Sequence, residues 1–333
     1  MLRRIVVPAL CAGWLFAFCL GMVHLVRQAQ AENGAEKPAA KKNAAQAAAK
    51  KGAEEQKYLR IVRDAKDVPT KLDTAIVRYV GKKGKYAGVT VDLIGAVHIG
   101  DKSYYDELNK RFAGYEALLY ELMAPKGTRI PKGGGQGRSG HPIGLMQEGM
   151  TDVLGLSYQL REVDYTKKNF VHADMSPKEF DAKMDERGES WMGMAFKMMG
   201  QSIAMQAQKG GAASTEMEML LALFDANREL KMKRALAKQF EDMEGVMDSF
   251  GGEEGSTIIT ERNIAALKVL KQQLRKGKKN VGIFYGAGHL PDMDKRLIEE
   301  FGLKRDKTEW LTAWDMSEPA KPAKAPAKKP AKQ

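Results

Sequence analysis

The amino-acid sequence predicts a mixed α/β fold, in which a mostly parallel sheet has flanking helices and a methionine-rich helical insertion. Short apolar runs bounded by turn residues alternate with helical spacing before about residue 125 and again after residue 255. Between them, residues 176–251 contain many methionines and helical spacing without a strand pattern. The simplest architecture is therefore one α/β domain interrupted by a helical segment.

Strands are predicted wherever a short apolar run lies between turn residues. In chain order these runs are "YLRIVR", "TAIVRYV", "VTVDLIGAVHIG", "EALLYELM", "NFVHADM", "NVGIFYGAGHLP" and "EWLTAWDM". Helical spacing is found in "KSYYDELNKRF", "TERNIAALKVLKQQLRKG" and "DMDKRLIEEFG". A further helix is predicted to open at Ser176, because Glu179 three residues later completes a capping box. The third and fourth strands with their intervening helix form a βαβ unit, whose strands run parallel.

The first 31 residues predict an export signal. Two arginines precede an uncharged apolar run over residues 5–26, and a suitable signal-peptidase site ends at Ala31. The run is also about long enough to cross a bilayer, which takes roughly 20 residues. Cleavage, giving a secreted protein, and retention as an amino-terminal membrane anchor are both open. Because the positive charges precede the run, the rest of the chain is expected to face the periplasm or the exterior.

Two segments of biased composition flank the predicted domain, which covers residues 58–316. Residues 32–57 form an Ala/Lys/Glu-rich linker, and residues 317–333 form a Pro/Ala/Lys tail that is expected to be disordered. Residues 1–57 carry nine Lys and Arg against four Asp and Glu, and the tail carries five against one. Most of the formal net charge of +12 therefore lies outside the domain. The basic composition is no argument for nucleic-acid binding. Both cysteines lie in the apolar run, so the exported part has no disulfide chemistry.

Five polar residues are candidates for a functional site, because they follow predicted strands or begin a predicted helix. They are His98, Glu121, Glu261, Arg262 and His289. Each histidine stands three residues after a glycine, which allows backbone or ligand to approach closely. Two histidines with one or two carboxylates suit a divalent metal such as Zn, Mn, Co or Fe. Such a metal would acidify water and polarise a carbonyl, while a free glutamate takes the proton and Arg262 steadies a carboxylate or an oxyanion.

The same residues also have a purely structural interpretation. A histidine at a strand end is often a hydrogen-bonded structural residue, and Glu121 could be a buried carboxylate paired with Arg262. Glu261 and Arg262 could be an ordinary exposed pair in an early helical turn. His172 and Asp174 could join the site, although alternation along one strand face explains that pair equally well. Spacing alone leaves these alternatives open.

The motifs "GAVHIG", "YELM", "ITERN" and "YGAGHLP", in that order around a helical middle, resemble those of the TraB/PrgY/GumN/TIKI family. The resemblance spans roughly residues 75–315. It implies a fold similar to that of erythromycin esterase and ChaN-like proteins. It also implies that His98, Glu121 and His289 hold a metal and that Glu121, Glu261 and Arg262 take part in catalysis. The TIKI branch of the family comprises membrane-tethered proteases that depend on Mn or Co.

Together these observations predict an extracytoplasmic, metal-dependent hydrolase that acts on a peptide or protein substrate and contacts the membrane through its amino-terminal segment. The expected cofactor is a divalent metal: Mn, Co or Zn. The alternative is a non-catalytic peptide- or haem-binding, signalling protein on the same fold. For that function the methionine-rich helices would matter more than the histidines.

Overall fold

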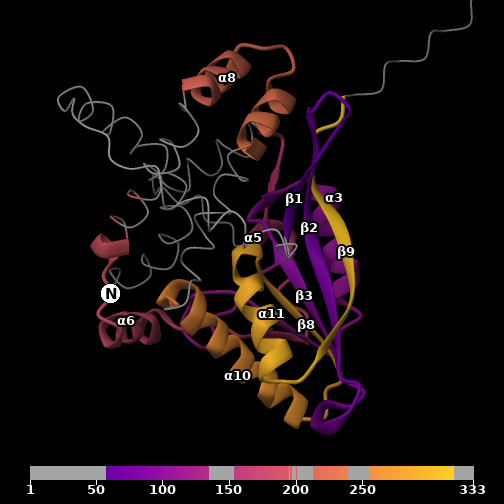
Figure 1. Cartoon of the computed structure of the whole chain (residues 1–333), viewed down its shortest axis with the longest axis vertical. Helices are drawn as coiled ribbons and strands as arrows, with labels where there is room; N and C mark the ends of the chain where they lie inside the picture. The colour runs from indigo at the N-terminus through magenta and orange to yellow at the C-terminus, as the bar shows by residue number, and fades with distance from the viewer. Residues whose placement is uncertain are drawn as a thin grey trace, which may run out of the picture.

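The computed structural model describes residues 58–134, 154–194, 196, 200, 213–238 and 255–318 (Figure 1). The predicted export signal, the linker and residues 319–333 of the tail lie outside the described residues, as do parts of the predicted helical insertion. None of the helices in the described ranges has the length and apolarity that a bilayer crossing requires.

A mixed sheet of seven strands forms the centre of the described fold. The strands are β1 (Leu59–Arg63), β2 (Pro69–Val80), β3 (Thr90–Ala96), β5 (Ala117–Tyr120), β7 (Phe170–His172), β8 (Asn280–Gly286) and β9 (Lys304–Asp315). One edge of β2 pairs with β9, and its other edge is shared by β1 and β3. All three of these pairings are antiparallel, so β2 alone runs against the other six strands. The predicted mostly parallel sheet with flanking helices is therefore confirmed.

The parallel part of the sheet has the order β3-β8-β5-β7. Helix α3 (Lys102–Phe112) connects β3 to β5, as the βαβ pattern predicts, but β8 lies between these two strands. A strand from late in the sequence is thus placed beside both earlier ones. This order brings the ends of β3, β8, β5 and β7 to the same edge of the sheet. A small second sheet, β4 (Ile99–Gly100) with β6 (Ser157–Tyr158), follows β3 at that edge.

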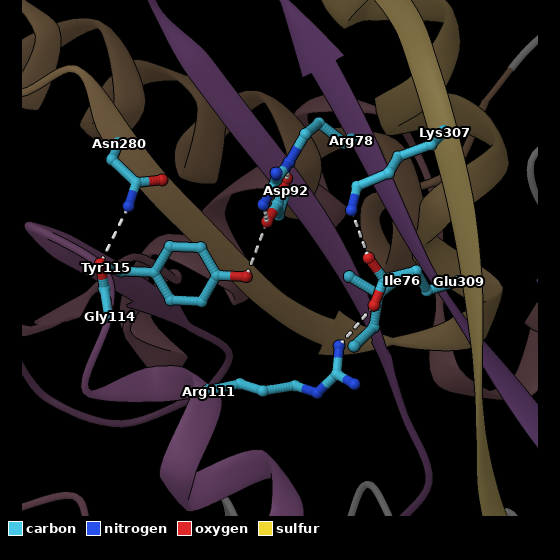
Figure 2. A pocket seen from close by; sticks show the side chains of 9 residues that line it. All are labelled: Ile76, Arg78, Asp92, Arg111, Gly114, Tyr115, Asn280, Lys307 and Glu309. Carbon is cyan, nitrogen blue, oxygen red and sulfur yellow. Dashed lines mark hydrogen bonds and ion pairs between the residues drawn. The ribbon is translucent and has the colours of Figure 1, made fainter.

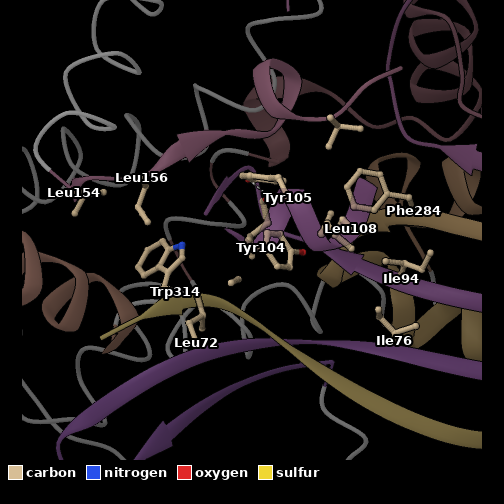
Figure 3. Close-up of a cluster of buried hydrophobic side chains, with 14 of the residues drawn as sticks. Leu72, Ile76, Ile94, Tyr104, Tyr105, Leu108, Leu154, Leu156, Phe284 and Trp314 are labelled. Atoms are coloured by element: carbon tan, nitrogen blue, oxygen red, sulfur yellow. Dashed lines mark hydrogen bonds between the residues drawn. The ribbon is translucent and has the colours of Figure 1, made fainter. Parts of the chain in front are cut away.

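Helices cover both faces of the sheet, so that the fold has three layers. Helices α10 (Arg262–Arg275) and α11 (Leu290–Glu299) lie along one face in Figure 1 and bury apolar side chains such as Leu270 and Leu297. Helix α3 covers the opposite face. There Tyr104, Tyr105 and Leu108 pack against sheet residues such as Ile94 and Phe284 (Figure 3). The strands β3, β8, β5 and β7 therefore have apolar side chains on both faces, as expected for a parallel sheet covered twice.

The described part of the predicted insertion is helical. It contains α6 (Pro177–Glu186), α8 (Ala213–Leu223) and a helix over residues 228–238, and the short α5 (Gln159–Glu162) precedes it. Ser176 and Glu179 form the predicted capping box, in which each side chain accepts a hydrogen bond from the other residue's backbone N–H. Short 3-10 turns cover Gly84–Tyr86 (η1) and Ala287–His289 (η3), and a π-helical turn covers Thr257–Glu261 (η2).

Candidate functional site

Four parallel strands carry polar side chains to one edge of the sheet. His98 follows β3 by two residues, Glu121 follows β5 directly, Asp174 follows β7 by two residues, and His289 closes the 3-10 turn after β8. Because parallel strands end at a common edge, residues that are far apart in the sequence meet there.

Arg262, the first residue of α10, lies at the centre of these groups. Its guanidinium forms a two-point ion pair with Asp174, with Nε to Oδ1 at 3.0 Å and Nη2 to Oδ2 at 2.6 Å. Nη2 also donates to Oε1 of Glu121 at 2.7 Å. The side chain of Asp174 is 0% exposed and that of Arg262 is 10% exposed. Burial alone would lower the pKa of Arg262, but Asp174 and Glu121 hold it well above its usual range. Arg262 thus stays positively charged inside the protein, and the two carboxylates that contact it balance that charge.

A π-helical turn, η2, delivers Arg262 and its neighbour Asn263 to the sheet. Ser256 caps this turn by accepting a hydrogen bond from the backbone N–H of Ile259, and its carbonyl accepts one from Glu261, five residues on. Arg262 and Asn263 are both buried where α10 begins. Wide turns of this kind are frequent at functional sites.

Asn263 fixes the orientation and tautomer of His289. Its amide nitrogen donates to the His289 carbonyl at 3.0 Å and to Oδ2 of Asp292 at 2.8 Å. Its amide oxygen therefore faces Nδ1 of His289, 2.7 Å away, and must accept from it. The proton of the neutral imidazole is assigned to Nδ1 by this network, and the lone pair of Nε2 accepts a hydrogen bond from Nη1 of Arg262 at 3.4 Å.

The Nε2 atom of His289 faces Glu121. It lies 3.6 Å from Oε1 of Glu121 and 3.4 Å from Nη1 of Arg262. Burial lowers the pKa of His289 to about 4, although the Glu121 carboxylate opposes that shift. Burial alone would raise the pKa of Glu121, but the positive charge of Arg262 outweighs it and holds this pKa below its usual range. At neutral pH the site thus presents an ionised carboxylate beside an unprotonated imidazole nitrogen.

The two motif glycines allow close approach of backbone, each in a different way. The N–H of Gly286 donates to Oε2 of Glu121 at 2.7 Å, and a Cβ atom at Gly286 would lie 3.3 Å from that oxygen. A Cβ atom at Gly95 would lie 3.2 Å from the carbonyl oxygen of Ala75 on the neighbouring β2. Gly286 therefore shapes the candidate site directly, whereas Gly95 allows β3 to pack closely in the sheet.

His98 is exposed beside the cluster. Its backbone carbonyl accepts a hydrogen bond from the N–H of Gln159 at 2.8 Å, which ties it to the second, smaller sheet. Its positive form would contribute to lowering the pKa of Glu121, so the two side chains are electrostatic neighbours. The structure therefore places His98 near the predicted site but on its solvent side.

Glu261 points elsewhere. Its carboxylate pairs with Nη1 of Arg187 at 3.4 Å and with Nζ of Lys183 at 3.8 Å, both from the α6 region. Among the described contacts it has none with Glu121 or His289. Although it precedes Arg262 directly, the structure does not bring it into the cluster, because the two side chains leave the turn in different directions.

The donor atoms can be compared with what the predicted metal requires. Two tetrahedral ligands each about 2.1 Å from one ion lie about 3.4 Å apart, close to the 3.6 Å between His289 Nε2 and Glu121 Oε1. Asn263 supplies the second hydrogen bond that a metal-binding histidine usually makes. Nowhere in the described ranges are three or more His, Cys, Asp or Glu side chains gathered closely enough to hold an ion. The described ranges thus offer two donors at a fitting separation, both of which contact the Arg262 guanidinium in this structure, and the predicted third, His98, lies outside that group.

A separate polar cavity of about 190 Å³ lies at the opposite end of the parallel strands, where β8 begins and where Gly114 precedes β5 (Figure 2). Asp92 binds Arg78 at 2.8 Å through both carboxylate oxygens and also accepts from the Tyr115 hydroxyl. Arg111 pairs with Glu309 at 2.7 Å. The charges in this cavity are paired with one another, so we interpret it as a structural ion-pair network.

Sequence reasoning missed one residue of the cluster and left a second undecided. Asn263 stands within the quoted motif "ITERN", but nothing in its spacing indicates that it binds His289. Asp174 was an open candidate, and its two bonds to Arg262 place it in the cluster. His172, its companion, instead binds the carbonyl of Leu122 at 2.6 Å. For Asn263 the sequence offers one signal, its place beside Arg262 at the start of a predicted helix, and that signal has little specificity.

Comparison of the chain with family models, with curated proteins and with solved structures finds no match. What defines the site is therefore its geometry: a buried Arg262 between two carboxylates, and a neutral histidine facing one of them.

Proposed function

We propose that the chain is an extracytoplasmic, metal-dependent hydrolase of the TraB/TIKI type that cleaves peptide bonds, with Glu121 and His289 at its centre. The observation that supports this most is the position of His289. Asn263 holds its ring through Nδ1, and its Nε2 atom lies 3.6 Å from Oε1 of Glu121. The amino-terminal signal supports the location, and the resemblance of the motifs supports the substrate class.

The protonation states favour ligation over direct base catalysis. A general base works best with a pKa near the operating pH, whereas the pKa of His289 is about 4 and that of Glu121 is lower than usual. Both groups are therefore weak bases at neutral pH. Metal ligands, in contrast, have to be unprotonated, and both groups meet that requirement. A bound divalent ion would acidify water and polarise the substrate carbonyl.

The protein's own groups have distinct roles in this proposal. Arg262 holds Oε1 of Glu121, and the Gly286 N–H holds Oε2, so the carboxylate is oriented before any ligand arrives. Asn263 keeps Nε2 of His289 free of its proton. His98, exposed on the solvent side and not gathered with these two donors in the structure, would supply the third donor only by moving toward them. Glu261 is proposed to act only indirectly, through its ion pairs with Arg187 and Lys183.

The alternative, a non-catalytic peptide- or haem-binding protein, has one supporting observation. Trp191, Met192 and Phe196, in the described part of the methionine-rich segment, all expose more than a third of their surface. Large exposed apolar side chains that lie near one another in the sequence are common where a partner or ligand binds. This function does not require Glu121 or His289.

Peptide cleavage by the full chain separates the two functions. A peptide mixture is incubated with chelator-treated protein, with and without Mn, Co or Zn, and products are identified by mass spectrometry. The hydrolase proposal predicts metal-restored cleavage by the wild type and loss of at least about 100-fold in His289→Gln and Glu121→Gln. His172→Gln, a histidine with a hydrogen bond outside the cluster, is the matched control and should keep the activity. Binding of peptide or haem without cleavage, unchanged in all three variants, would support the alternative.

A further inference from the structure

Helix α8 and the helix over residues 228–238 form a hairpin whose turn covers residues 224–227. Lys238 of the second helix donates to Glu218 of the first at 2.8 Å. The inner face of the hairpin joins the large hydrophobic cluster of the domain. It does so through the buried side chains of Ala222, Met232 and Leu236. The hairpin is therefore part of the folded domain.

The outer face of the same hairpin is apolar and exposed. In the last turn of α8 the exposed fractions are 55% at Leu220, 66% at Leu221 and 43% at Leu223. Phe224, in the loop between the two helices, is 89% exposed. We call these four residues the apolar tip. A helix that is apolar on all sides is normally buried on all sides. The last turn of α8 contains only apolar residues and fully buries only Ala222, so the tip requires an apolar partner outside the described fold.

The basic tail leaves the domain beside this hairpin. Arg234, on the second helix, donates to the carbonyl of Met316 at 2.9 Å and to the carboxylate of Glu318 at 2.9 Å. It lies six residues, or about 9 Å, along the helix from Arg228, the first helical residue after the turn. Beyond Glu318 the sequence contains five lysines and no acidic residue. An apolar surface and a polybasic segment thus start from the same end of the molecule.

We propose that the apolar tip inserts into the surface of an anionic lipid bilayer and that the lysines of residues 319–333 bind its headgroups. Neither element is sufficient alone: four side chains bury little area, and a polybasic segment is released by salt. Two such signals together produce stable attachment to a membrane. The expected amino-terminal anchor would keep the tip close to that bilayer.

The proposal also orients the candidate site. Lys233 of the hairpin binds Asp101 at 3.0 Å, and Asp101 stands three residues after His98. Arg234 of the hairpin also donates to the carbonyl of Pro69, the first residue of β2. Because β2 and β3 are antiparallel, β2 starts at the edge of the sheet where β3 ends. Figure 1 shows α8 beyond that end of the sheet. Membrane docking through the tip would place the cluster of Glu121 and His289 toward the lipid surface.

The test measures whether residue 224 enters lipid in the full-length protein. Cys11 and Cys19 are replaced by serine, Phe224→Cys is labelled with an environment-sensitive fluorophore, and the chain is reconstituted into vesicles of phosphatidylglycerol or of phosphatidylcholine. Quenching by brominated lipid reports insertion. Lys83→Cys, an exposed position in the turn after β2 at the other end of the sheet, is the matched control. Two further variants carry Leu220→Asp with Leu221→Asp, or glutamine in place of the five tail lysines.

The proposal predicts several-fold stronger quenching at residue 224 than at residue 83 in phosphatidylglycerol vesicles. The paired aspartates should reduce it to the level of residue 83, and the glutamine tail should reduce it to the level seen in phosphatidylcholine. Equal quenching at the two positions would overturn the proposal. The proposal would also be overturned if the label at residue 224 became more protected from water as the ratio of protein to lipid rose, independently of lipid charge. A second copy of the chain would then cover the tip.

Discussion

The Nδ1 atom of His289 lies 2.7 Å from the amide oxygen of Asn263, and this contact determines which ring nitrogen of the histidine carries the proton. The amide nitrogen of Asn263 donates to the His289 carbonyl and to Asp292. This fixes the orientation of the amide, so that its oxygen faces Nδ1 of His289. The residue after Arg262 thus controls the chemistry of a histidine 26 positions later. Both neighbours, Arg262 and Asn263, are needed to complete the site.

Replacing Asn263 by aspartate should change the protonation of His289. A carboxylate beside Nδ1 stabilises the imidazolium, so the pKa of His289 should rise from about 4 by more than one unit. NMR titration of the histidine ring signals measures this, with His289→Gln identifying the resonance. Asn227→Asp, at an exposed turn, is the control and should leave the His289 titration unchanged. An unaltered pKa in Asn263→Asp would show that the contact does not control the ring.

Removing the guanidinium of Arg262 should destabilise the fold strongly. Arg262→Met leaves the fully buried Asp174 without its charged partner, and removing one member of a buried ion pair costs about 3–5 kcal/mol. Adding Asp174→Asn to that variant should recover part of the loss, since the unpaired charge disappears. Urea unfolding measures both. Lys102→Met, which breaks an exposed pair with Asp106, should cost far less, because solvent screens that pair. Similar losses for the two single variants would contradict a buried, coupled pair.

The free energy of unfolding should fall as the pH is lowered from about 6.5 toward 4. In the unfolded chain His289 has its ordinary pKa of 6.5, whereas in the folded protein its pKa is about 4. Between these values the unfolded state binds more protons, so acid favours unfolding, with a slope approaching 1.4 kcal/mol per pH unit. Glu121, whose folded pKa is also lowered, adds to the loss only below the ordinary glutamate range.

The His289 contribution is isolated by chelator-treated protein unfolded in urea at several pH values above 4.5. In His289→Gln, the slope of the unfolding free energy with pH should decrease by an amount that corresponds to nearly one bound proton. His172→Gln removes a histidine outside the cluster and should retain it. An unchanged slope in His289→Gln would mean that this ring is not buried in its neutral form.

A methyl group at Gly286 should disturb Glu121. The added Cβ would lie 3.3 Å from Oε2 of Glu121, which already receives the Gly286 N–H. Gly286→Ala should therefore lower the free energy of unfolding by about 1–3 kcal/mol, the usual cost of overpacking. Gly200→Ala is the control, because that glycine is helical with no atom near its missing Cβ, and alanine there should be neutral or stabilising. Equal stability of the two variants would contradict the tight approach.

The elements of this fold were largely predictable, because their signals are local. The apolar run before Gly286 reflects a strand that is buried on both faces, and the helical spacing after Lys102 reflects burial of one face of a helix. The insertion of β8 between β3 and β5 was not predictable, because strand order depends on contacts between residues about 160–190 positions apart. The sequence carries no local sign of that pairing.

The candidate site was predictable in part, where it depends on residues at the ends of predicted strands. Glu121 follows β5 directly and His289 closes the short turn after β8, so their meeting at one edge follows from the fold class. Glu261 was expected beside them, yet the π-helical turn η2 directs it to Arg187 while Arg262 faces the sheet. The direction of a side chain within a turn depends on its hydrogen bonding, which residue identity alone does not specify. Asn263 was missed for this reason as well.

The measurement closest to the proposed centre is the metal affinity of the full chain, purified without chelator, followed by titration of Mn, Co or Zn into stripped protein. Wild type should hold about one equivalent of a divalent transition metal, and His289→Gln and Glu121→Gln should lose it, whereas His172→Gln should not. His98→Ala should weaken binding if that exposed ring completes the ligand set. Absence of binding by the wild type, or equal affinity in the His289 and Glu121 variants, would contradict a metal centre at this cluster.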